Sequence, residues 1–370
     1  MQRALCFDDV LLVPQYSDIE SRSQVDLSVT GFESQFASLT PHHSQLTCPV
    51  VGSPMDTVMG PRSAALLANM GGFGILHRYC SIEEAKNTYE ETTELILNDN
   101  SHKNVMVAIG ATGDFLERTS ALFEAGCRAF CIDVAHGHHL HVKKALKTLR
   151  DIYGKKIHIM TGNVATLEAF NELAEWGSDS IRVGVGGGSM CSTRIRTGHG
   201  IPTFQSVLDC AKSHHDVYLV ADGGIRNSGD AVKALAAGAD MIMLGSILAG
   251  HDESPGDIVD KNGSCTVITN KNGYKMKVPT SGTSFYKKFR GMASLEAQLE
   301  WRGKVSVVEG ESTLVPYKGP MKNTLTDLFD GMRSGLSYSG VTTIRELRSN
   351  AKFVTITAQG VRENVPHGKM

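Results

Sequence analysis

A glycine-rich segment that contains a cysteine carries the most chemistry in this sequence. It reads Gly-Val-Gly-Gly-Gly-Ser-Met-Cys-Ser-Thr over residues 184–193 and follows the apolar run 180–183. Glycine allows a tight turn and a close approach of the backbone to a ligand. A cysteine held among backbone N–H groups in such a loop is suited to act as a nucleophile, whereas a buried cysteine beside a turn is the structural alternative. Cys191 is therefore a candidate nucleophile whose assignment depends on its surroundings.

The composition is that of an ordinary globular protein. The chain has 370 residues, a net charge of −2, 41% hydrophobic residues and 21% charged residues. This charge gives no electrostatic reason to bind nucleic acid or an anionic membrane, and no apolar run approaches the roughly 20 residues that span a bilayer. The eight cysteines lack CxxC pairs and zinc-site spacing, so we expect reduced thiols in a cytoplasmic protein. His136, His138 and His139 lack a second ligand pair and indicate a solvated loop rather than a metal site.

Short apolar runs recur along the chain, each followed by glycine or small polar residues and then by an amphipathic stretch. Runs of this length without alternation are typical of strands buried on both faces of a parallel sheet. The expected strands are 49–53, 72–77, 105–110, 129–134, 157–162, 180–184, 217–224 and 240–246, and the clearest helices are 115–126, 140–153, 166–176 and 228–238. Eight such units predict an α/β fold, the (β/α)8 TIM barrel, with its active site at the C-terminal ends of the strands. The alternative, a doubly wound sheet, lacks its usual early GxGxxG turn.

We expect a single barrel domain over residues 1–370 with three departures from the repeat. Residues 252–283 are polar, and two apolar pieces within them predict an inserted lid or hairpin. A short flap is expected at the catalytic face over 296–313. The C-terminal tail 354–370 is polar, so we expect it to be disordered or to contact a neighbouring subunit.

Three loops at the ends of the expected sixth, seventh and eighth strands offer groups suited to a phosphate. Backbone amides beside glycines and serine hydroxyls form a neutral anion cradle, and barrels commonly bind phosphate after strands seven and eight. Asp222, at the end of its strand, is placed to accept hydrogen bonds from ribose hydroxyls, or else it caps the following helix. Together with Cys191, these loops predict a phosphorylated substrate lying across the barrel mouth.

The sequence resembles the IMP dehydrogenase / GMP reductase family from about residue 5 to residue 355. The matching motifs, in the family's order, are 7–14, 55–57, 184–193, 197–200, 222–226 and 290–292. The resemblance implies a (β/α)8 barrel, a purine nucleoside monophosphate substrate and a nicotinamide cofactor. It also implies a covalent bond between the loop cysteine, here Cys191, and C2 of the purine.

The resemblance further assigns the positions that bind substrate, cofactor and ions. The nucleotide would be held by Ser53, Met55, Ser189, Asp222, Gly224, Gly245, Ser246, Arg290, Gly291, Met292 and Ala293. The cofactor would lie against Asp133, Val134 and Ala135, and a monovalent cation such as K+ would lie on the backbone of Gly186, Gly188 and Cys191.

Proton transfer is the expected role of Thr193, two residues after the cysteine. A carboxylate beside its hydroxyl would prepare it for acid–base work, and Glu296 and Glu309 are the candidates, with a solvated surface position as the alternative for each. Where the family has a Tyr before Arg-Gly-Met, this chain has Phe289. Tyr286 or Tyr338 is the candidate for the missing hydroxyl.

The family contains two reactions that share the covalent step. The dehydrogenase oxidises IMP with NAD and hydrolyses the thioimidate to XMP, whereas the reductase expels ammonia from GMP and uses NADPH to give IMP. The reductase is favoured by the lack of room for a regulatory domain between residues 77 and 105, by the lack of an Arg–Tyr pair in 291–309, and by the reductase-like segment 21–27. The dehydrogenase is favoured by the spacing of Glu296 and by the tail segment 360–363.

The sequence therefore predicts an NADPH-dependent GMP reductase, expected to form a homotetramer. IMP dehydrogenase, with NAD, is the first alternative. A non-catalytic regulator that binds purine nucleotides is the second, although a regulator has no use for a nucleophile aimed at C2.

Overall fold

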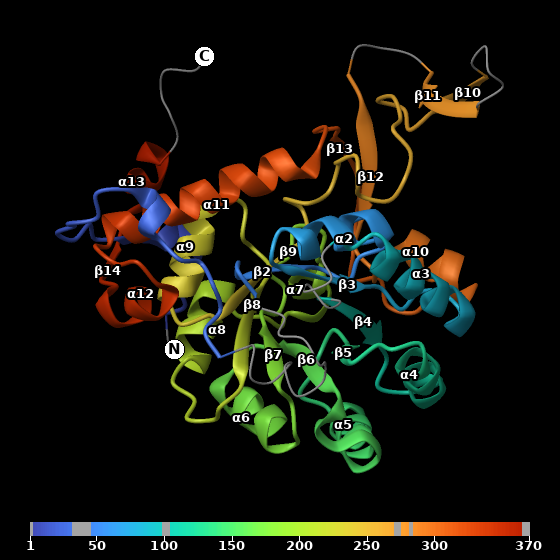
Figure 1. Ribbon diagram of the computed structural model, residues 1–370, viewed down its shortest axis with the longest axis horizontal. Helices are drawn as coiled ribbons and strands as arrows, with labels where there is room; N and C mark the ends of the chain where they lie inside the picture. Colours follow the sequence, from blue (N-terminus) through green and yellow to red (C-terminus); the bar gives the residue numbers. More distant parts are fainter. Residues whose placement is uncertain (1–2, 32–45, 98–103, 270–274, 281–283, 365–370) are drawn as a thin grey trace.

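Eight parallel strands close into a barrel in the computed structural model, which describes residues 3–31, 46–97, 104–269, 275–280 and 284–364 (Figure 1). The barrel closes where β2 pairs with β9. The strands are β2 (Val50–Gly52), β3 (Phe73–Leu76), β4 (Val105–Ile109), β5 (Ala129–Asp133), β6 (His158–Val164), β7 (Ser180–Val183), β8 (Tyr218–Asp222) and β9 (Met241–Leu244). Each lies within, or within two residues of, a predicted apolar run, and the TIM barrel predicted from the sequence is confirmed.

The barrel strands are apolar on both faces because both faces are buried. Along β4, Val105, Val107 and Ile109 join the hydrophobic cluster that packs against the helices. Met106 and Ala108 join a second cluster, made mostly of strand residues, that fills the barrel interior. This two-layer burial explains why the runs show no polar alternation.

Helices surround the barrel and follow the strands in the expected order (Figure 1). Several begin at a side-chain cap, such as Ser81, Thr166 and Asn227, whose oxygens accept hydrogen bonds from backbone N–H groups of the first turn. The helices are α2 (Pro61–Asn69), α3 (Ile82–Glu94), α4 (Phe115–Glu124), α5 (Leu140–Tyr153), α6 (Leu167–Glu175), α7 (Thr193–Thr197), α8 (Thr203–Cys210), α9 (Ser228–Ala236), α11 (Met321–Tyr338) and α12 (Ile344–Asn350). Short 3-10 helices cover Phe7–Asp9, Arg22–Gln24 and Gly154–Lys156.

Two hairpins follow the last barrel strand. β10 (Cys265–Thr269) pairs with β11 (Lys275–Pro279) and projects away from the barrel (Figure 1). This pairing corresponds to the hairpin alternative for the insertion, and none of its described residues lines the cavity at the barrel mouth. β12 (Tyr286–Arg290) pairs with β13 (Ser312–Pro316), and the sequence analysis missed this second hairpin.

The segment expected to be a flap, 296–313, has regular structure at both ends. It begins inside α10 (Leu295–Arg302), and β13 starts before it finishes. The tail is also structured in its described part. There β14 (Phe353–Thr355) pairs with β1 (Val10–Leu12), and α13 (Ala358–Glu363) follows. The rest of the tail, 365–370, lies outside the described residues.

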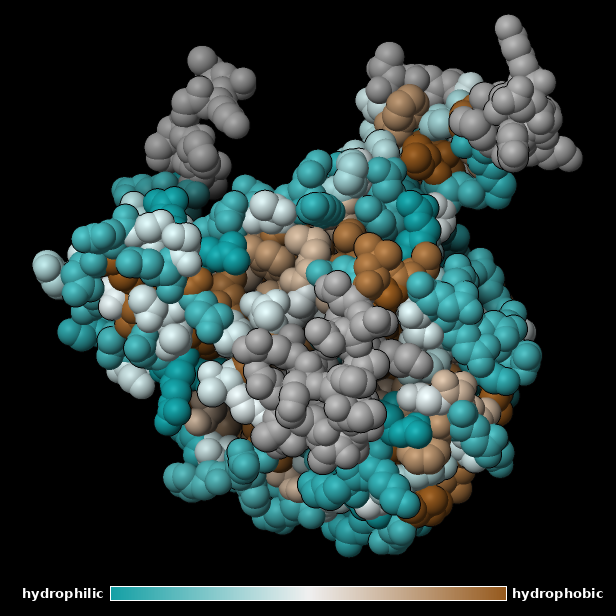
Figure 2. Space-filling model, in the orientation of Figure 1, coloured by the Kyte–Doolittle hydropathy of each residue, from teal (hydrophilic) through white to brown (hydrophobic). Residues whose placement is uncertain are grey.

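The visible surface is largely hydrophilic, with apolar side chains gathered near α2 and β9 and on the projecting hairpin (Figure 2). Among the described residues, no helix combines the length and apolar character that a membrane span requires.

Candidate active site

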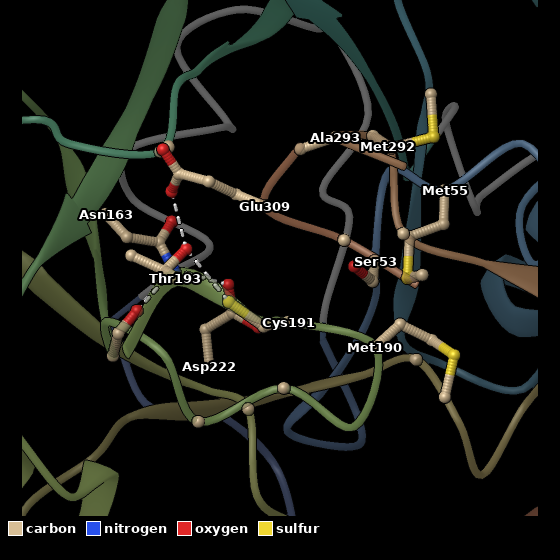
Figure 3. Close-up of a pocket in the computed structure, with 18 of the residues that line it drawn as sticks. Ser53, Met55, Asn163, Met190, Cys191, Thr193, Asp222, Met292, Ala293 and Glu309 are labelled. Carbon is tan, nitrogen blue, oxygen red and sulfur yellow. Dashed lines mark hydrogen bonds between the residues drawn. The ribbon is translucent and has the colours of Figure 1, made fainter. Parts of the chain in front are cut away.

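The C-terminal ends of the barrel strands open into a cavity of about 490 Å³ (Figure 3). This volume suits a small-molecule ligand of nucleotide size. Apart from Glu296 and Arg290, every site residue predicted from the sequence lines it. These residues are Ser53, Met55, Asp133, Val134, Ala135, Gly186, Gly188, Ser189, Cys191, Thr193, Asp222, Gly224, Gly245, Ser246, Gly291, Met292, Ala293 and Glu309.

Cys191, Thr193 and Glu309 form a continuous relay of hydrogen bonds at this cavity (Figure 3). The Cys191 thiol donates to Thr193 Oγ1 over 3.2 Å, and the Thr193 hydroxyl donates to Glu309 Oε2 over 2.7 Å. Cys191 is exposed, so its sulfur is accessible to a ligand in the cavity. The arrangement can carry a proton from the thiol to a carboxylate and back.

The backbone of the cysteine loop is fixed from two sides. The Cys191 N–H donates to the Gly188 carbonyl at 3.1 Å, and the Ser192 N–H donates to the Glu309 carbonyl at 2.9 Å. Glycine is required inside the loop, because a Cβ on Gly184 would lie 1.9 Å from the Asp222 carbonyl oxygen. Gly184 also has a φ of +147°, which side chains disfavour. The relay therefore depends on backbone contacts as well as on its side chains.

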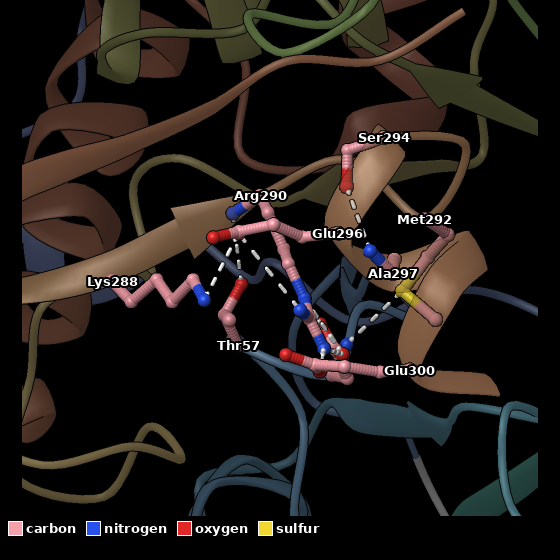
Figure 4. A network of polar contacts seen from close by, with 9 residues as sticks. Thr57, Lys288, Arg290, Met292, Ser294, Glu296, Ala297 and Glu300 are labelled. Carbon is pink, nitrogen blue, oxygen red and sulfur yellow. Dashed lines mark hydrogen bonds and ion pairs between the residues drawn. The ribbon is translucent and has the colours of Figure 1, made fainter. Parts of the chain in front are cut away.

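Glu309, and not Glu296, contacts Thr193. Glu296 instead forms an ion pair with Lys288 at 2.9 Å, and the hydrogen bond from Lys288 lowers the pKa of Glu296 (Figure 4). The two glutamates were equivalent candidates in the sequence. The structure separates them because the β12–β13 hairpin brings residue 309 back over the cysteine loop.

Arg290 also lies outside the cavity lining. Its guanidinium binds Asp56 and Glu300, and its side chain is 9% exposed (Figure 4). Next to it in sequence, Phe289 does line the cavity and is buried. Neither Tyr286 nor Tyr338 is part of the lining, so neither places a hydroxyl there.

Two polar residues that the sequence analysis missed hold Asp222 in place. Asn163 Nδ2 donates to Asp222 Oδ2 at 2.7 Å, and Arg182 Nη2 lies 3.4 Å from the same oxygen. Arg182 also donates to Asp133 at 2.7 Å. Burial opposes the positive charge of Arg182, but the nearby acidic groups outweigh it and raise its pKa. The cap of α9 is Asn227, so Asp222 does not serve as that helix cap.

The role of Arg182 could have been suspected from the sequence, because Arg182 is the one charged residue in the predicted buried strand 180–183. A charge at a doubly buried strand position requires a partner. Asn163 directly follows the predicted run 157–162, and a polar residue at the end of a strand is common. Its role became visible only when β6 was placed beside β7.

A second cavity of about 270 Å³ shares Arg78 and Val134 with the first. Arg78 Nε donates to the Asp133 carbonyl at 3.2 Å. Three imidazoles also line this cavity, from His136, His139 and His141. In the described parts of the chain no group of three or more His, Cys, Asp and Glu is arranged to hold a metal ion.

The barrel and the Cys191–Thr193–Glu309 relay form a cavity at the barrel mouth that is suited to cysteine chemistry on a small ligand. A model of the IMP dehydrogenase / GMP reductase domain matches residues 4–367. Inosine-5'-monophosphate dehydrogenase of Nitrosopumilus maritimus (strain SCM1) is 32% identical, covering 99% of this chain and 98% of that protein. GMP reductase 1 of Mus musculus is 34% identical, covering 96% of each chain.

A solved structure gives the same result for the fold. It is a cysteine-to-alanine variant of GMP reductase from Trypanosoma brucei in complex with guanosine 5'-monophosphate. It matches with a TM-score of 0.83 and 28% identity, covering 100% of this chain and 99% of that one. This chain belongs to the IMP dehydrogenase / GMP reductase family. It is an oxidoreductase of that family, for which a purine nucleotide substrate and a nicotinamide cofactor are implied.

Proposed function

We propose that the protein is a GMP reductase that converts GMP to IMP and ammonia with NADPH. The observation that carries the proposal is the Cys191–Thr193–Glu309 relay, with its 3.2 Å and 2.7 Å hydrogen bonds. Release of ammonia needs a nucleophile and a proton donor but no activated water. Between residues 291 and 309 the sequence has Arg302 as its one arginine and has no tyrosine, so the pair expected for water activation is missing.

The chain's own residues account for bond making and proton transfer. The Cys191 sulfur forms a bond to C2 of GMP while its proton passes through Thr193 to Glu309. The bond from C2 to the amino nitrogen then breaks, and the relay returns the proton so that ammonia leaves. The nicotinamide cofactor, when bound, supplies a hydride to C2. The bond from C2 to sulfur breaks last, which releases IMP and restores the thiol after protonation. In sum, GMP, NADPH and two protons give IMP, NADP+ and ammonium.

The lining of the cavity is matched to the three parts of the nucleotide. Glycine amides and serine hydroxyls at the ends of β7, β8 and β9 are suited to the phosphate. Asp222, held by Asn163, is suited to the ribose hydroxyls. Met55, Met292 and Ala293 provide an apolar surface against which the base can pack.

NADPH is the proposed cofactor, held by Asp133, Val134 and Ala135. The basic lining formed by Arg78 and three histidines, continuous with this position, favours a ligand with several phosphates. The pKa of His136 is lowered by burial and by the neighbouring histidines, and a bound phosphate would oppose this effect. Substitution Arg78→Gln should raise KM for NADPH more than KM for NADH, and equal effects on both would argue against NADPH selection.

We also propose that the protein is a cytoplasmic homotetramer in which each subunit is a single barrel domain. A monovalent cation would lie on the backbone of Gly186, Gly188 and Cys191. Light scattering after size-exclusion chromatography tests the tetramer. Replacement of K+ by Li+ in the assay tests the cation, since a K+ site should lose activity in Li+.

IMP dehydrogenase activity is the second candidate, favoured by the relative from Nitrosopumilus maritimus. Purified protein should be assayed with GMP and NADPH, and separately with IMP and NAD, by following nicotinamide absorbance. Oxidation of NADPH that requires GMP supports the reductase. Reduction of NAD that requires IMP, without the first reaction, would replace it by the dehydrogenase.

A further inference from the structure

Arg290 and Asp56 join two chain segments that are far apart in sequence. Arg290 ends β12, and Asp56 lies in the loop after β2. Arg290 Nε donates to the two carboxylate oxygens of Asp56 at 3.2 and 3.0 Å, and Arg290 Nη2 binds the second of these oxygens (Figure 4). The Arg290 N–H also donates to Thr57 Oγ1 at 3.2 Å. A forked, charge-assisted contact of this kind fixes both position and orientation.

The ion pair lies directly behind two methionines of the cavity lining. Met55 precedes Asp56, Met292 follows Arg290 by two residues, and both line the cavity. The Asp56 N–H donates to Met292 Sδ over 3.3 Å. Methionine side chains are flexible, so their placement depends on the backbone that carries them. The Asp56–Arg290 pair holds that backbone on both sides.

The Arg290 guanidinium also contacts α10, the helix that precedes Glu309 in the chain. Arg290 Nη2 donates to Glu300 on α10 at 2.5 Å. From α10, Gln298 Nε2 donates to the Ala293 and Val307 carbonyls at 3.0 Å each. Arg290 is thus connected, through α10, to the chain that ends at Glu309.

Burial of this ion pair carries a desolvation cost, which favours a role in positioning over a role in stability. The Arg290 and Asp56 side chains are 9% and 15% exposed. A buried ion pair is often replaceable by uncharged groups without loss of stability, whereas removal of one partner leaves a buried charge unpaired. Among the described residues Arg290 Nη1 is buried without a hydrogen bond, and its nearest acidic oxygen, Glu296 Oε2, lies 3.9 Å away, an arrangement that a contact optimised for stability alone would avoid.

We propose that Asp56 and Arg290 form a positioning clamp: the pair fixes the part of the cavity lining against which the purine base packs. Neither residue lines the cavity, so both act through Met55, Met292 and α10. The inference rests on the proposed function in one respect, namely that a purine nucleotide occupies the cavity with its base on this side.

The test uses the 370-residue chain in three variants. Arg290→Lys keeps the charge but removes the fork. The double variant Asp56→Asn, Arg290→Gln removes both charges of the buried pair, and Glu300, which loses its contact with Arg290, is 61% exposed and so remains solvated. Lys288→Gln is the matched control, since Lys288 lies on the same strand and pairs with Glu296 at a half-exposed position, whereas Glu296 reaches Arg290 only at 3.9 Å. For each protein we would measure the melting temperature, the Kd for GMP and IMP, kcat, KM, and the rate of Cys191 alkylation by iodoacetamide without nucleotide.

If the clamp positions the base, the substitutions should change nucleotide binding but not the melting temperature or the alkylation rate. The double variant should melt near the wild type, yet its nucleotide Kd and KM should rise about tenfold, a change of roughly 1.4 kcal/mol. Arg290→Lys should show the same rise. The alkylation rate should stay within about twofold of the wild type, because the relay is intact, and Lys288→Gln should match the wild type throughout.

Two results would overturn the clamp. The first is a folded double variant with wild-type Kd and KM, which would make the pair purely structural. The second is an equal loss in Lys288→Gln, which would make the effect unspecific. Turnover of GMP by the wild type tests the proposed function separately, because the clamp is judged from the ratio of variant to wild type for whichever nucleotide binds.

Discussion

Glu309 accepts a 2.7 Å hydrogen bond from Thr193 across a sequence separation of 116 residues. The contact exists because β13 turns back along β12 and carries residues 309–311 against the cysteine loop. It brings a carboxylate that is distant in the chain within hydrogen-bonding distance of the residue that contacts Cys191. The proposed chemistry therefore depends on a hairpin outside the eight-unit barrel.

Removal of the Glu309 carboxylate should impair catalysis more than binding. In Glu309→Gln the carboxylate that accepts the thiol proton is lost, so we expect kcat to fall about 100- to 10,000-fold, the usual range for an acid–base group. KM for GMP should change little. Glu296→Gln is the control, because that carboxylate pairs with Lys288 instead, and it should keep kcat within about twofold. Equal losses in the two variants, measured by steady-state kinetics, would contradict the assignment.

Cys191→Ala should abolish turnover and leave nucleotide binding intact. Alanine removes the sulfur that bonds to C2, while the loop backbone keeps its contacts with Gly188 and Glu309. Calorimetric titration with GMP measures the binding, and nicotinamide absorbance measures the turnover. Residual turnover well above background would mean that the reaction proceeds without covalent catalysis.

Phe289→Tyr should strengthen nucleotide binding. Phe289 lines the cavity where the family has a tyrosine, and a hydroxyl there can donate to a charged phosphate. We expect KM for GMP to fall about 3- to 10-fold, with Tyr286→Phe unchanged. The opposite pattern, no gain in Phe289→Tyr and a loss in Tyr286→Phe, would show that Tyr286 supplies the hydroxyl in the complex.

Acid should destabilise the fold through His158, which is buried at the start of β6 with Nε2 2.9 Å from Ser180 Oγ. Burial lowers the pKa of His158 to about 4, although Asp179 acts in the opposite direction. The unfolded chain takes up this proton near pH 6.5, so protonation favours the unfolded state as the pH falls from 6.5 towards 4.

This histidine should therefore cost about 2 kcal/mol of unfolding free energy between pH 7 and pH 5. Urea unfolding of the wild type and of His158→Gln at both pH values measures the effect. The variant should lose less stability than the wild type by about that amount. Parallel losses in the two proteins would assign the pH dependence to other groups.

The barrel was predictable because its strands are buried on both faces, which leaves eight continuous apolar runs in the sequence. The β12–β13 hairpin was not, because its residues break that pattern. Lys287 is buried yet polar and donates to the His251 carbonyl at 2.9 Å. The sequence around Lys287 does not predict its burial, because the backbone carbonyls that stabilise its charge come from a distant loop. The choice between Glu296 and Glu309 depended on this hairpin and could not be made from spacing.

Arg290 shows a second limit of sequence reasoning. The motif placed it in the site, and it does lie beside the cavity, but its side chain turns to Asp56 and Glu300. A sequence motif predicts the region of the fold in which a residue lies, whereas the partner of a long side chain depends on which loops fold around it. Asn163 illustrates the converse, since a plain strand end acquires a role when β6 brings it to Asp222.

Reductase activity is tested most directly by the nicotinamide absorbance of the wild-type protein with GMP and NADPH, beside IMP and NAD. We expect oxidation of NADPH that requires GMP, forms IMP and ammonia in equal amounts, and is abolished in Cys191→Ala. Reduction of NAD with IMP alone would identify a dehydrogenase. Silence in both reactions, with nucleotide bound, would contradict the enzyme and leave a nucleotide-binding regulator.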